Sequence, residues 1–137
     1  HSDTTLIVQV TDSSGKRLLD NTPKPRLVLD PWAVASVNQT LKGVIQQGTA
    51  QTAKLGRPAA GKTGTTDAER DVWFVGYVPQ LSVAVWAGND NYSRIGTGAT
   101  GGNYVAPVWR SFMQRALKGV PPQDFAPPGN FQRPTGF

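Results

Sequence analysis

Residues 56–65 read Gly56-Arg57-Pro58-Ala59-Ala60-Gly61-Lys62-Thr63-Gly64-Thr65, and this stretch decides the fold because it can be parsed in two incompatible ways. Read from Gly56, it fits the pattern GxxxxGK[ST], in which backbone amides at the start of a helix cradle a phosphate. Read from Lys62, it fits an edge strand that flanks a cleft and presents one positive charge beside two hydroxyls. The neighbouring segments favour one of the two.

The segments around the stretch fit a strand better than a phosphate loop. A phosphate loop needs a buried strand before it and a helix after it. Residues 51–55 do not read as a buried strand, and Pro58 lies inside the loop. Gly64-Thr65-Thr66 are among the poorer helix formers, and a strand pattern follows them. A nucleotide-binding loop therefore remains as the weaker alternative.

The chain after residue 70 predicts a small antiparallel sheet. Two apolar runs, 72–78 and 81–87, are separated only by Pro79-Gln80, a link too short for a parallel crossover. With the Lys62 strand they form a predicted three-stranded core over residues 58–88. Apolar residues at helical spacing predict helices over 30–48 and 103–119. The first helix is expected to bury a stripe of Val34, Val37, Leu41, Val44 and Ile45.

The two ends of the chain are expected to be peripheral. A strand from Thr4 to Val10, a turn at Asp12-Ser13-Ser14-Gly15 and a return at Arg17–Leu19 predict a hairpin within residues 1–20. Residues 122–137 contain four prolines and are expected to be extended or disordered. The predicted fold class is α+β, with residues 1–121 as the structured part and 122–137 as a proline-rich tail.

Composition limits the classes of partner. The chain has 137 residues, enough for one modest domain, and carries 14 Lys and Arg against 9 Asp and Glu, a formal charge of +5. The basic residues are dispersed, which favours anionic partners in general but argues against nucleic acid. The absence of cysteine excludes disulfides and thiolate metal sites. We expect no cofactor and no metal.

Lys62-Thr63-Gly64-Thr65 and its surroundings resemble the C-terminal part of the transpeptidase domain of class A, bifunctional, penicillin-binding proteins. The resemblance runs from about Leu6 to Phe125. It implies the fold shared by penicillin-binding proteins and serine β-lactamases, and a D,D-transpeptidase that crosslinks peptidoglycan through a serine acyl-enzyme and is acylated by β-lactams. The matching segments are Gln47-Gly48-Thr49, residues 56–66, residues 70–77, Thr100-Gly101-Gly102 and residues 106–109.

The resemblance assigns roles to four residues. It implies that Lys62, Thr63 and Thr65 hold the carboxylate of the substrate or antibiotic, and that Gly64 keeps the strand open to the ligand. It also implies that the Thr65 backbone N–H is an oxyanion-hole donor, a type of contact worth about 3 kcal/mol of transition-state stabilisation. Structural roles are expected for Asp71, Trp73 and Phe74.

The nucleophile is expected to be missing from this chain. The family also needs Ser-x-x-Lys and Ser-x-Asn motifs. Both patterns occur, at Ser13-Ser14-Gly15-Lys16 and at Ser36-Val37-Asn38. Ser13 lies in a predicted hairpin turn, whereas Ser36 and Asn38 lie on a predicted helix beside its expected apolar stripe and should point mostly to solvent. We interpret both matches as coincidental.

The chain is therefore expected to be a C-terminal fragment that is inactive alone and lacks the acylation serine, the glycosyltransferase domain and the membrane anchor. Expected partners are a stem peptide ending in D-alanyl-D-alanine, β-lactam antibiotics, the missing N-terminal part of the same enzyme, and a second copy paired through an exposed sheet edge. The expected location is the extracytoplasmic face of the bacterial cytoplasmic membrane. The alternatives are a non-catalytic cell-wall or β-lactam binding module and the nucleotide binder.

Overall fold

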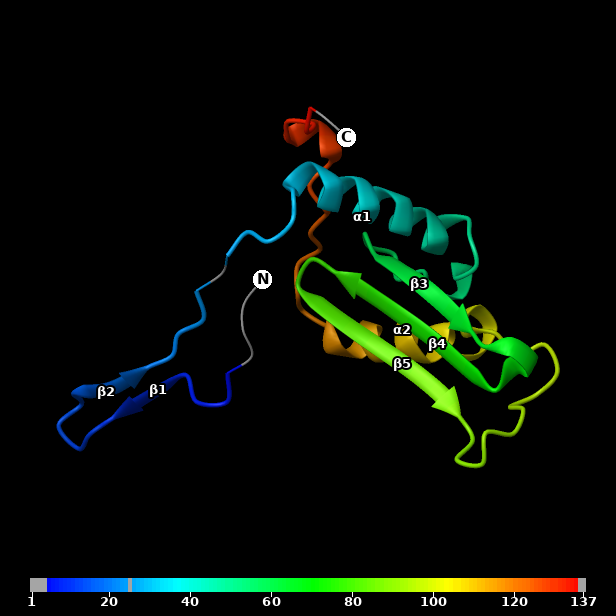
Figure 1. Cartoon of the computed structure of the whole chain (residues 1–137), viewed down its shortest axis with the longest axis horizontal. Coiled ribbons are helices and arrows are strands. Elements are labelled where there is room, and N and C mark those ends of the chain that lie inside the picture. Colours follow the sequence, from blue (N-terminus) through cyan, green and yellow to red (C-terminus); the bar gives the residue numbers. More distant parts are fainter. Residues whose placement is uncertain (1–4, 25, 136–137) are drawn as a thin grey trace. The chain divides into compact units, whose positions relative to one another are not determined.

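The computed structural model describes residues 5–24 and 26–135, which divide into a unit up to Asp30 and a larger one from Pro31 (Figure 1). The larger unit contains an antiparallel sheet and two long helices, which confirms the predicted α+β class. The stretch from Gly56 to Thr65 lies in this unit, which is therefore the part that positions the candidate site.

The first unit is an antiparallel hairpin of β1 (Gln9–Thr11) and β2 (Arg17–Asp20). The sequence predicted a first strand from Thr4 to Val10; Thr4 lies outside the described residues, and the observed strand begins at Gln9. The Asp12 side chain accepts backbone bonds from Ser14 and Lys16 at 2.9 Å each, so the turn is closed by a side chain that imitates a backbone acceptor.

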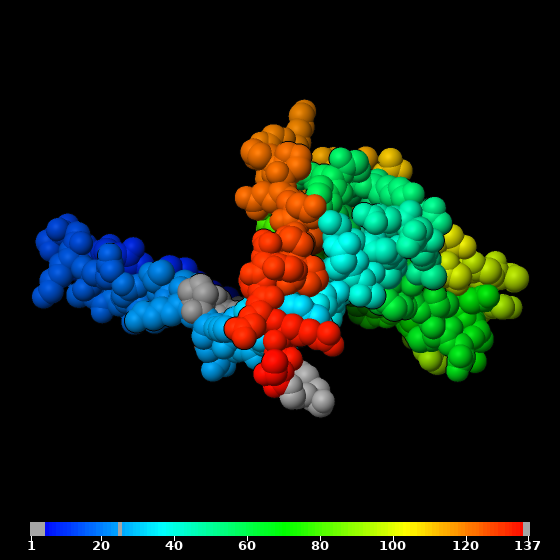
Figure 2. Space-filling model, turned by 90° about the horizontal axis from the view of Figure 1, so that it is seen from above, coloured from blue at the N-terminus to red at the C-terminus, as the bar shows by residue number. Residues whose placement is uncertain are grey.

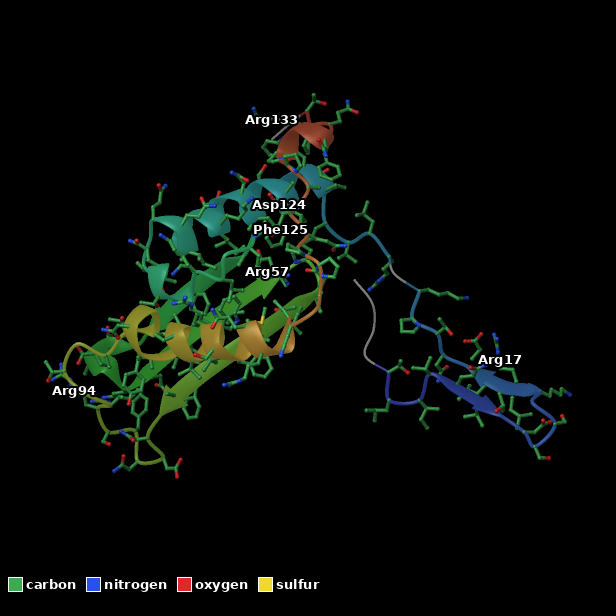
Figure 3. The ribbon with its side chains drawn as sticks, turned by 180° about the vertical axis from the view of Figure 1, so that it is seen from behind. Arg17, Arg57, Arg94, Asp124, Phe125 and Arg133 are labelled. Carbon is green, nitrogen blue, oxygen red and sulfur yellow. The ribbon has the colours of Figure 1, made fainter. Side chains whose placement is uncertain are left out.

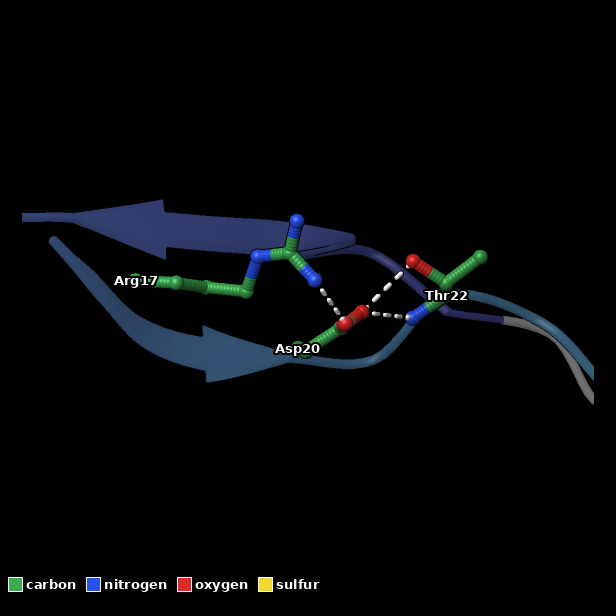
Figure 4. A network of polar contacts seen from close by, with 3 residues as sticks. All are labelled: Arg17, Asp20 and Thr22. Carbon is green, nitrogen blue, oxygen red and sulfur yellow. Dashed lines mark hydrogen bonds and ion pairs between the residues drawn. The ribbon is translucent and has the colours of Figure 1, made fainter. Parts of the chain in front are cut away.

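A second carboxylate closes the open end of the hairpin (Figure 4). Asp20 accepts bonds from the hydroxyl and the backbone N–H of Thr22, at 2.5 and 3.0 Å, and pairs with Arg17. These contacts, the Thr22 hydroxyl first, lower the pKa of Asp20 to about 2, because each of them favours the ionised carboxylate. Hydrogen bonds to the side chains of Asp12 and Asp20 thus stabilise the two ends of the hairpin.

The sheet of the second unit has the order β3-β4-β5, with β3 at Ala60–Thr65, β4 at Asp71–Val78 and β5 at Leu81–Gly88. All pairs are antiparallel, as predicted, and the register places Lys62 opposite Val75 and Trp73 opposite Trp86. Because directly opposed residues share a face and neighbours along a strand alternate, this register assigns every side chain of the sheet to one of two faces.

The two long helices cover opposite faces of the sheet. Trp109 of α2 (Ala106–Ala116) packs against Phe74 with ring centroids 5.1 Å apart, and its indole N–H donates to the Gly76 carbonyl. Asn38 of α1 (Pro31–Gln46) instead accepts a 2.7 Å bond from the hydroxyl of Tyr77. Phe74 and Tyr77 are three positions apart on β4, so they face opposite sides, and the larger unit has three layers (Figure 1).

The apolar stripe predicted for α1 is wrong in the first half of the helix and right in its second half, where Val44 and Ile45 pack in the core. Val34 and Val37 are 39% and 54% exposed, whereas Ala35 and Ile45 are buried. The buried face runs through Ala35, Asn38 and Ile45, because Tyr77 offers a hydroxyl to Asn38 and the small Ala35 side chain allows close packing. Counting only large apolar residues pointed to the wrong side in the first half of the helix.

The proline-rich tail is extended and lies against α1 (Figure 2). Asp124 pairs with Lys42 at 2.8 Å, the Phe125 ring packs edge-on against Tyr77, and the Arg133 guanidinium lies 5.1 Å from the centre of the Trp32 ring. The short helical turn η4 (Pro128–Asn130) also packs on α1. Residues 136–137 lie outside the described part. The tail thus becomes part of the larger unit.

Candidate functional site

The four predicted site residues lie on β3, the edge strand of the sheet, at the end where β4 begins. Alternation along the strand separates their side chains. Lys62 and Gly64 lie on the face of α1, with Val75 and Trp73 as partners, whereas Thr63 and Thr65 lie on the face of α2. The exposed Lys62 ammonium donates to the Thr63 carbonyl at 2.8 Å, and so curls towards the free edge.

The backbone of β3 turns some of its donors away from the sheet. The Thr66 N–H donates to the Asp71 carbonyl at 3.0 Å, so these two opposed residues form a hydrogen-bonded pair. In an antiparallel ladder, hydrogen-bonded and non-bonded pairs alternate along the strand. Gly64 and Lys62 therefore also bond to β4, and the residues between them do not. The N–H of Thr65 therefore points to the open edge of β3, on the side where a ligand could approach.

Both threonine hydroxyls are used within the fold. The Thr63 hydroxyl lies 2.8 Å from the hydroxyl of Thr49, which follows α1. The Thr65 hydroxyl accepts the Gly101 N–H at 3.2 Å. Thr49 and Gly101 therefore fix the rotamers of the two side chains that the sequence assigned to carboxylate binding.

Gly101 and Gly102, which are distant from β3 in sequence, pack closely against the backbone around the site. They open η3 (Gly101–Val105), a single π-helical stretch that leads directly into α2 and is capped by the side chain of Thr100. A β-carbon on Gly101 would lie 2.0 Å from the Trp73 carbonyl, and one on Gly102 would lie 2.0 Å from the Thr49 carbonyl. Only glycine allows this approach. The consecutive glycines in the sequence indicate a close backbone approach at this point. The sequence does not show that the approach is to β3 and to Thr49.

The loop before Gly101 is held by the turn that follows β3. Glu69, in η2 (Asp67–Glu69), accepts a 3.0 Å bond from the Gly98 N–H and forms an ion pair with Arg94. These contacts, the Arg94 bond first, lower the pKa of Glu69. Sequence reasoning missed Glu69 because its partners lie more than 20 residues away. It links the β3–β4 turn to the loop that carries Gly101.

Gly61, the residue before Lys62 on β3, lies against the core. A β-carbon there would lie 2.7 Å from the Phe74 ring, so the absence of a side chain makes room for the core rather than for a ligand. Gly64 is the more open of the two, since its nearest neighbour would be the Trp73 side chain at 3.3 Å. Phe74 is fully buried, in keeping with the structural role expected for it.

An apolar surface surrounds Lys62 on the face of α1. Trp73, Val75 and Trp86 are 43%, 42% and 49% exposed, and the two indole rings lie 6.2 Å apart. The Trp86 N–H donates to Asp71 at 3.0 Å, which orients the ring. Exposed apolar clusters of this kind mark contact surfaces. We call Trp73, Val75 and Trp86 the tryptophan surface.

Neither serine motif is arranged as a nucleophile with its base. Ser13 is exposed in the hairpin turn, and Ser36 donates its hydroxyl to the Trp32 carbonyl at 2.8 Å, a bond within α1. The prediction that Asn38 points to solvent is wrong, because its side chain bonds Tyr77 on the sheet. Burial raises the pKa of that tyrosine. The absence of a nucleophile stays a prediction.

The phosphate-loop hypothesis fails on local structure. Lys62 lies inside β3, and the residues that follow Thr65 form a single short turn and then β4. In the described part of the chain, no α-helix begins directly after Lys62-Thr63, so the geometry that holds a phosphate is missing. Within residues 5–24 and 26–135, no three His, Asp or Glu side chains gather as a metal site. In the same ranges no helix is both long and apolar enough to cross a membrane.

The chain belongs to the family described as "Penicillin binding protein transpeptidase domain", whose sequence pattern matches residues 4–114. Proteins named Penicillin-binding protein 1A are similar to it. The one from Clostridium acetobutylicum is 36% identical over 131 residues, which cover 94% of this chain and 16% of that protein. The one from Aquifex aeolicus is 36% identical over 126 residues, 90% of this chain and 17% of that protein. The chain thus spans about one sixth of these relatives.

A solved structure agrees on the fold. The crystal structure of Penicillin-Binding Protein 1A from Haemophilus influenzae matches with a TM-score of 0.60 and 22% sequence identity, and the match covers 93% of this chain and 25% of that one. The architecture predicted from the resemblance, an antiparallel sheet with packed helices, is therefore confirmed.

Proposed function

We propose that this chain supplies one wall of the active site of a peptidoglycan D,D-transpeptidase. The observation that carries the proposal is the position of Lys62-Thr63-Gly64-Thr65 on an edge strand, with the Thr65 N–H directed to the open side. On this proposal Lys62 binds the carboxylate of a D-alanyl-D-alanine stem peptide or of a β-lactam. The Thr65 N–H donates to the oxyanion that forms when a serine attacks.

The threonine hydroxyls take a more specific part in this proposal than the sequence indicated. Thr63 is held by Thr49 and Thr65 by the Gly101 N–H, so neither is free to rotate. A hydroxyl that bonds another hydroxyl can still direct one donor or lone pair to a ligand. We therefore assign carboxylate binding first to Lys62 and Thr63, and to Thr65 first its backbone donor.

The nucleophile comes from another polypeptide segment in this proposal. A transpeptidase forms an ester between a serine oxygen and the penultimate D-alanine carbonyl, expels the terminal D-alanine, and passes the acyl group to an amine of a second stem peptide. The chain offers donors for the oxyanion and a cation for the carboxylate. We propose that the enzyme works on the extracytoplasmic face of the cytoplasmic membrane, where peptidoglycan is crosslinked.

The test is covalent labelling by a fluorescent penicillin. We expect no label on this chain alone, and a label on the partner's serine when the chain is mixed with a polypeptide that carries the Ser-x-x-Lys part of the domain. Lys62→Ala should slow that acylation about ten- to a hundredfold, the loss of one charge-assisted bond. Intact mass spectrometry over time gives the rate. Lys54→Ala, which removes a charge outside β3, is the control and should label normally.

Two results would sink this proposal. One is a stable penicillin adduct on Ser13 or Ser36 of the isolated chain, since it would make this chain its own nucleophile. The other is equal acylation of the Lys62→Ala and Lys54→Ala mixtures. A non-catalytic binding module, the second candidate, predicts reversible penicillin binding by the chain alone and no gain from the complementary polypeptide.

We further propose that the isolated chain associates with itself through the outer edges of β3 or β5 and the tryptophan surface. Both edges leave backbone groups unpaired within the described sheet, and Trp73 and Trp86 are about half exposed beside them. Light scattering after size exclusion should give at least twice the monomer mass of 14.7 kDa at high concentration. Trp86→Glu should return it to monomer; a monomer for the unchanged chain would contradict the proposal.

A further inference from the structure

A cavity of about 520 Å³ opens in the larger unit beside α1, and none of residues 60–65 lines it. It is formed where α1, the segment that leads into β3 and the tail meet. This segment, residues 54–59, includes the first half of the phosphate-loop pattern, for which the proposed transpeptidase site has no use. The charged residues of the lining are Lys42, Lys54, Arg57 and Asp124.

The charge in this cavity is not balanced. Lys42 and Asp124 form an ion pair at 2.8 Å, and the Lys42 side chain is only 14% exposed. Lys54 and Arg57 then remain, which leaves a formal charge of +2 on the lining. No hydrogen bond or ion pair of the Lys54 side chain occurs within residues 5–24 and 26–135. Two positive groups in a concave site attract an anion more strongly than the same groups on a convex surface.

The Arg57 guanidinium is only partly satisfied. One terminal nitrogen, Nη2, donates to the Val120 carbonyl at 2.5 Å and links the segment before β3 to the segment after α2. The other, Nη1, is buried and has no partner in the described part of the chain. Buried polar atoms nearly always find one, so the Arg57 guanidinium keeps one N–H group that no acceptor of the described chain uses.

The carboxylate of Asp124 is an oxyanion of the chain itself that already binds a cation of this cavity. It lies on the tail and reaches Lys42 of α1, and Figure 3 shows Asp124 and Arg57 coming from separate segments of the larger unit. The Lys42 bond is the first cause that lowers the pKa of Asp124, so the carboxylate is held ionised. One of the three cations of the cavity is thus already occupied by a carboxylate from the same chain, and two are not.

We propose that this cavity is a binding site for a small oxyanion, a phosphate or a carboxylate group, held by Lys54 and Arg57 with Lys42 beside them. Guanidinium and ammonium groups are the usual means by which proteins bind both anions. Asp124 competes with the ligand for Lys42. The inference is independent of the proposed transpeptidase role, because it uses no residue of β3.

The test is a titration of the isotopically labelled chain with sodium phosphate and, separately, with sodium acetate, at constant ionic strength. Amide shifts of residues 54–57 should move together and saturate. Lys54→Gln should weaken binding about three- to tenfold, as one charge-assisted bond is lost. Asp124→Asn should strengthen binding by a similar factor, because Lys42 is released. The controls are Lys118→Gln and Asp90→Asn, which make the same charge changes away from the cavity and should leave the affinity unchanged.

The outcomes are distinct. Saturation by phosphate alone assigns a phosphate site, and saturation by acetate alone assigns a carboxylate site. The proposal is overturned if neither anion gives saturable shifts at residues 54–57. It is also overturned if Lys54→Gln and Lys118→Gln weaken binding equally, or if Asp124→Asn binds no more tightly than Asp90→Asn, since a diffuse surface charge and not a site would then be responsible.

Discussion

Gly101→Ala is expected to destabilise the chain by at least about 3 kcal/mol, because the new methyl group has no space. Its β-carbon would lie 2.0 Å from the Trp73 carbonyl, 2.9 Å from the Gly64 carbonyl and 3.1 Å from the Gly64 nitrogen. All three neighbours are backbone atoms of the sheet, so no side chain can rotate away. Either η3 lifts off β3 or the sheet bends, and in both cases the Gly101 bond to Thr65 is lost.

Denaturant unfolding measures this effect, and the same loop supplies the control. A β-carbon on Gly96 would meet nothing within 4 Å, and its φ is not in the left-handed region. Gly96→Ala should therefore be neutral or slightly stabilising, by about 0.5 kcal/mol, through the entropy of the unfolded chain. Equal unfolding midpoints for the two variants would show that η3 does not lie against β3 as described. Failure of only Gly101→Ala to fold would agree with the prediction.

Trp109→Ala is expected to cost about 4 kcal/mol, a large share of the 5–15 kcal/mol that typically holds a domain together. Trp109 is fully buried, packs edge-on against Phe74 and donates its indole N–H to the Gly76 carbonyl at 3.2 Å. Truncation leaves a cavity between α2 and the sheet and removes the indole donor to the Gly76 carbonyl. Because Phe74 opposes Thr63 in the register, the candidate site should loosen with the core.

Two further variants separate the contributions of volume and hydrogen bonding. Trp109→Phe keeps much of the volume and loses the indole donor, so it should cost about 2 kcal/mol. Trp86→Ala removes the same ring from a position that is 49% exposed on the other face, and should cost about 1 kcal/mol or less. Thermal unfolding followed by circular dichroism ranks the three. A larger loss for Trp86→Ala than for Trp109→Ala would contradict the assignment of the two faces.

The local pattern of the sequence was sufficient for the elements of the larger unit. Helices expected over 30–48 and 103–119 correspond to α1 at Pro31–Gln46 and to η3 with α2 over 101–116, and the expected strands correspond to β3, β4 and β5. These segments have strong periodicity or short links, so neighbours in sequence decide their structure. The same pattern was weak in the hairpin, where the strand is shorter than expected because residues 5–8 find few backbone partners.

The sequence predicted that the helices and strands exist better than it predicted which face each of them buries. The helix α1 turns Ala35 and Asn38 to the sheet, although Val34 and Val37 are the more apolar residues. The reason lies in the partner: a helix buries the side that fits the opposing surface, and Tyr77 is about 40 residues away in sequence. The tail provides a second case, because Asp124 and Arg133 contact α1 through an ion pair and a cation–π contact that composition could not predict.

The sequence by itself determined that Lys62-Thr63-Gly64-Thr65 forms a strand and not a phosphate loop, and it determined the family, since both depend on contiguous residues. The tertiary structure decided how that strand is presented. It placed Lys62 and the threonines on opposite faces, gave Thr65 a Gly101 partner 36 residues away, and gathered Lys42, Lys54, Arg57 and Asp124 around one cavity. Pairing and packing between distant segments make these choices, and no local pattern contains them.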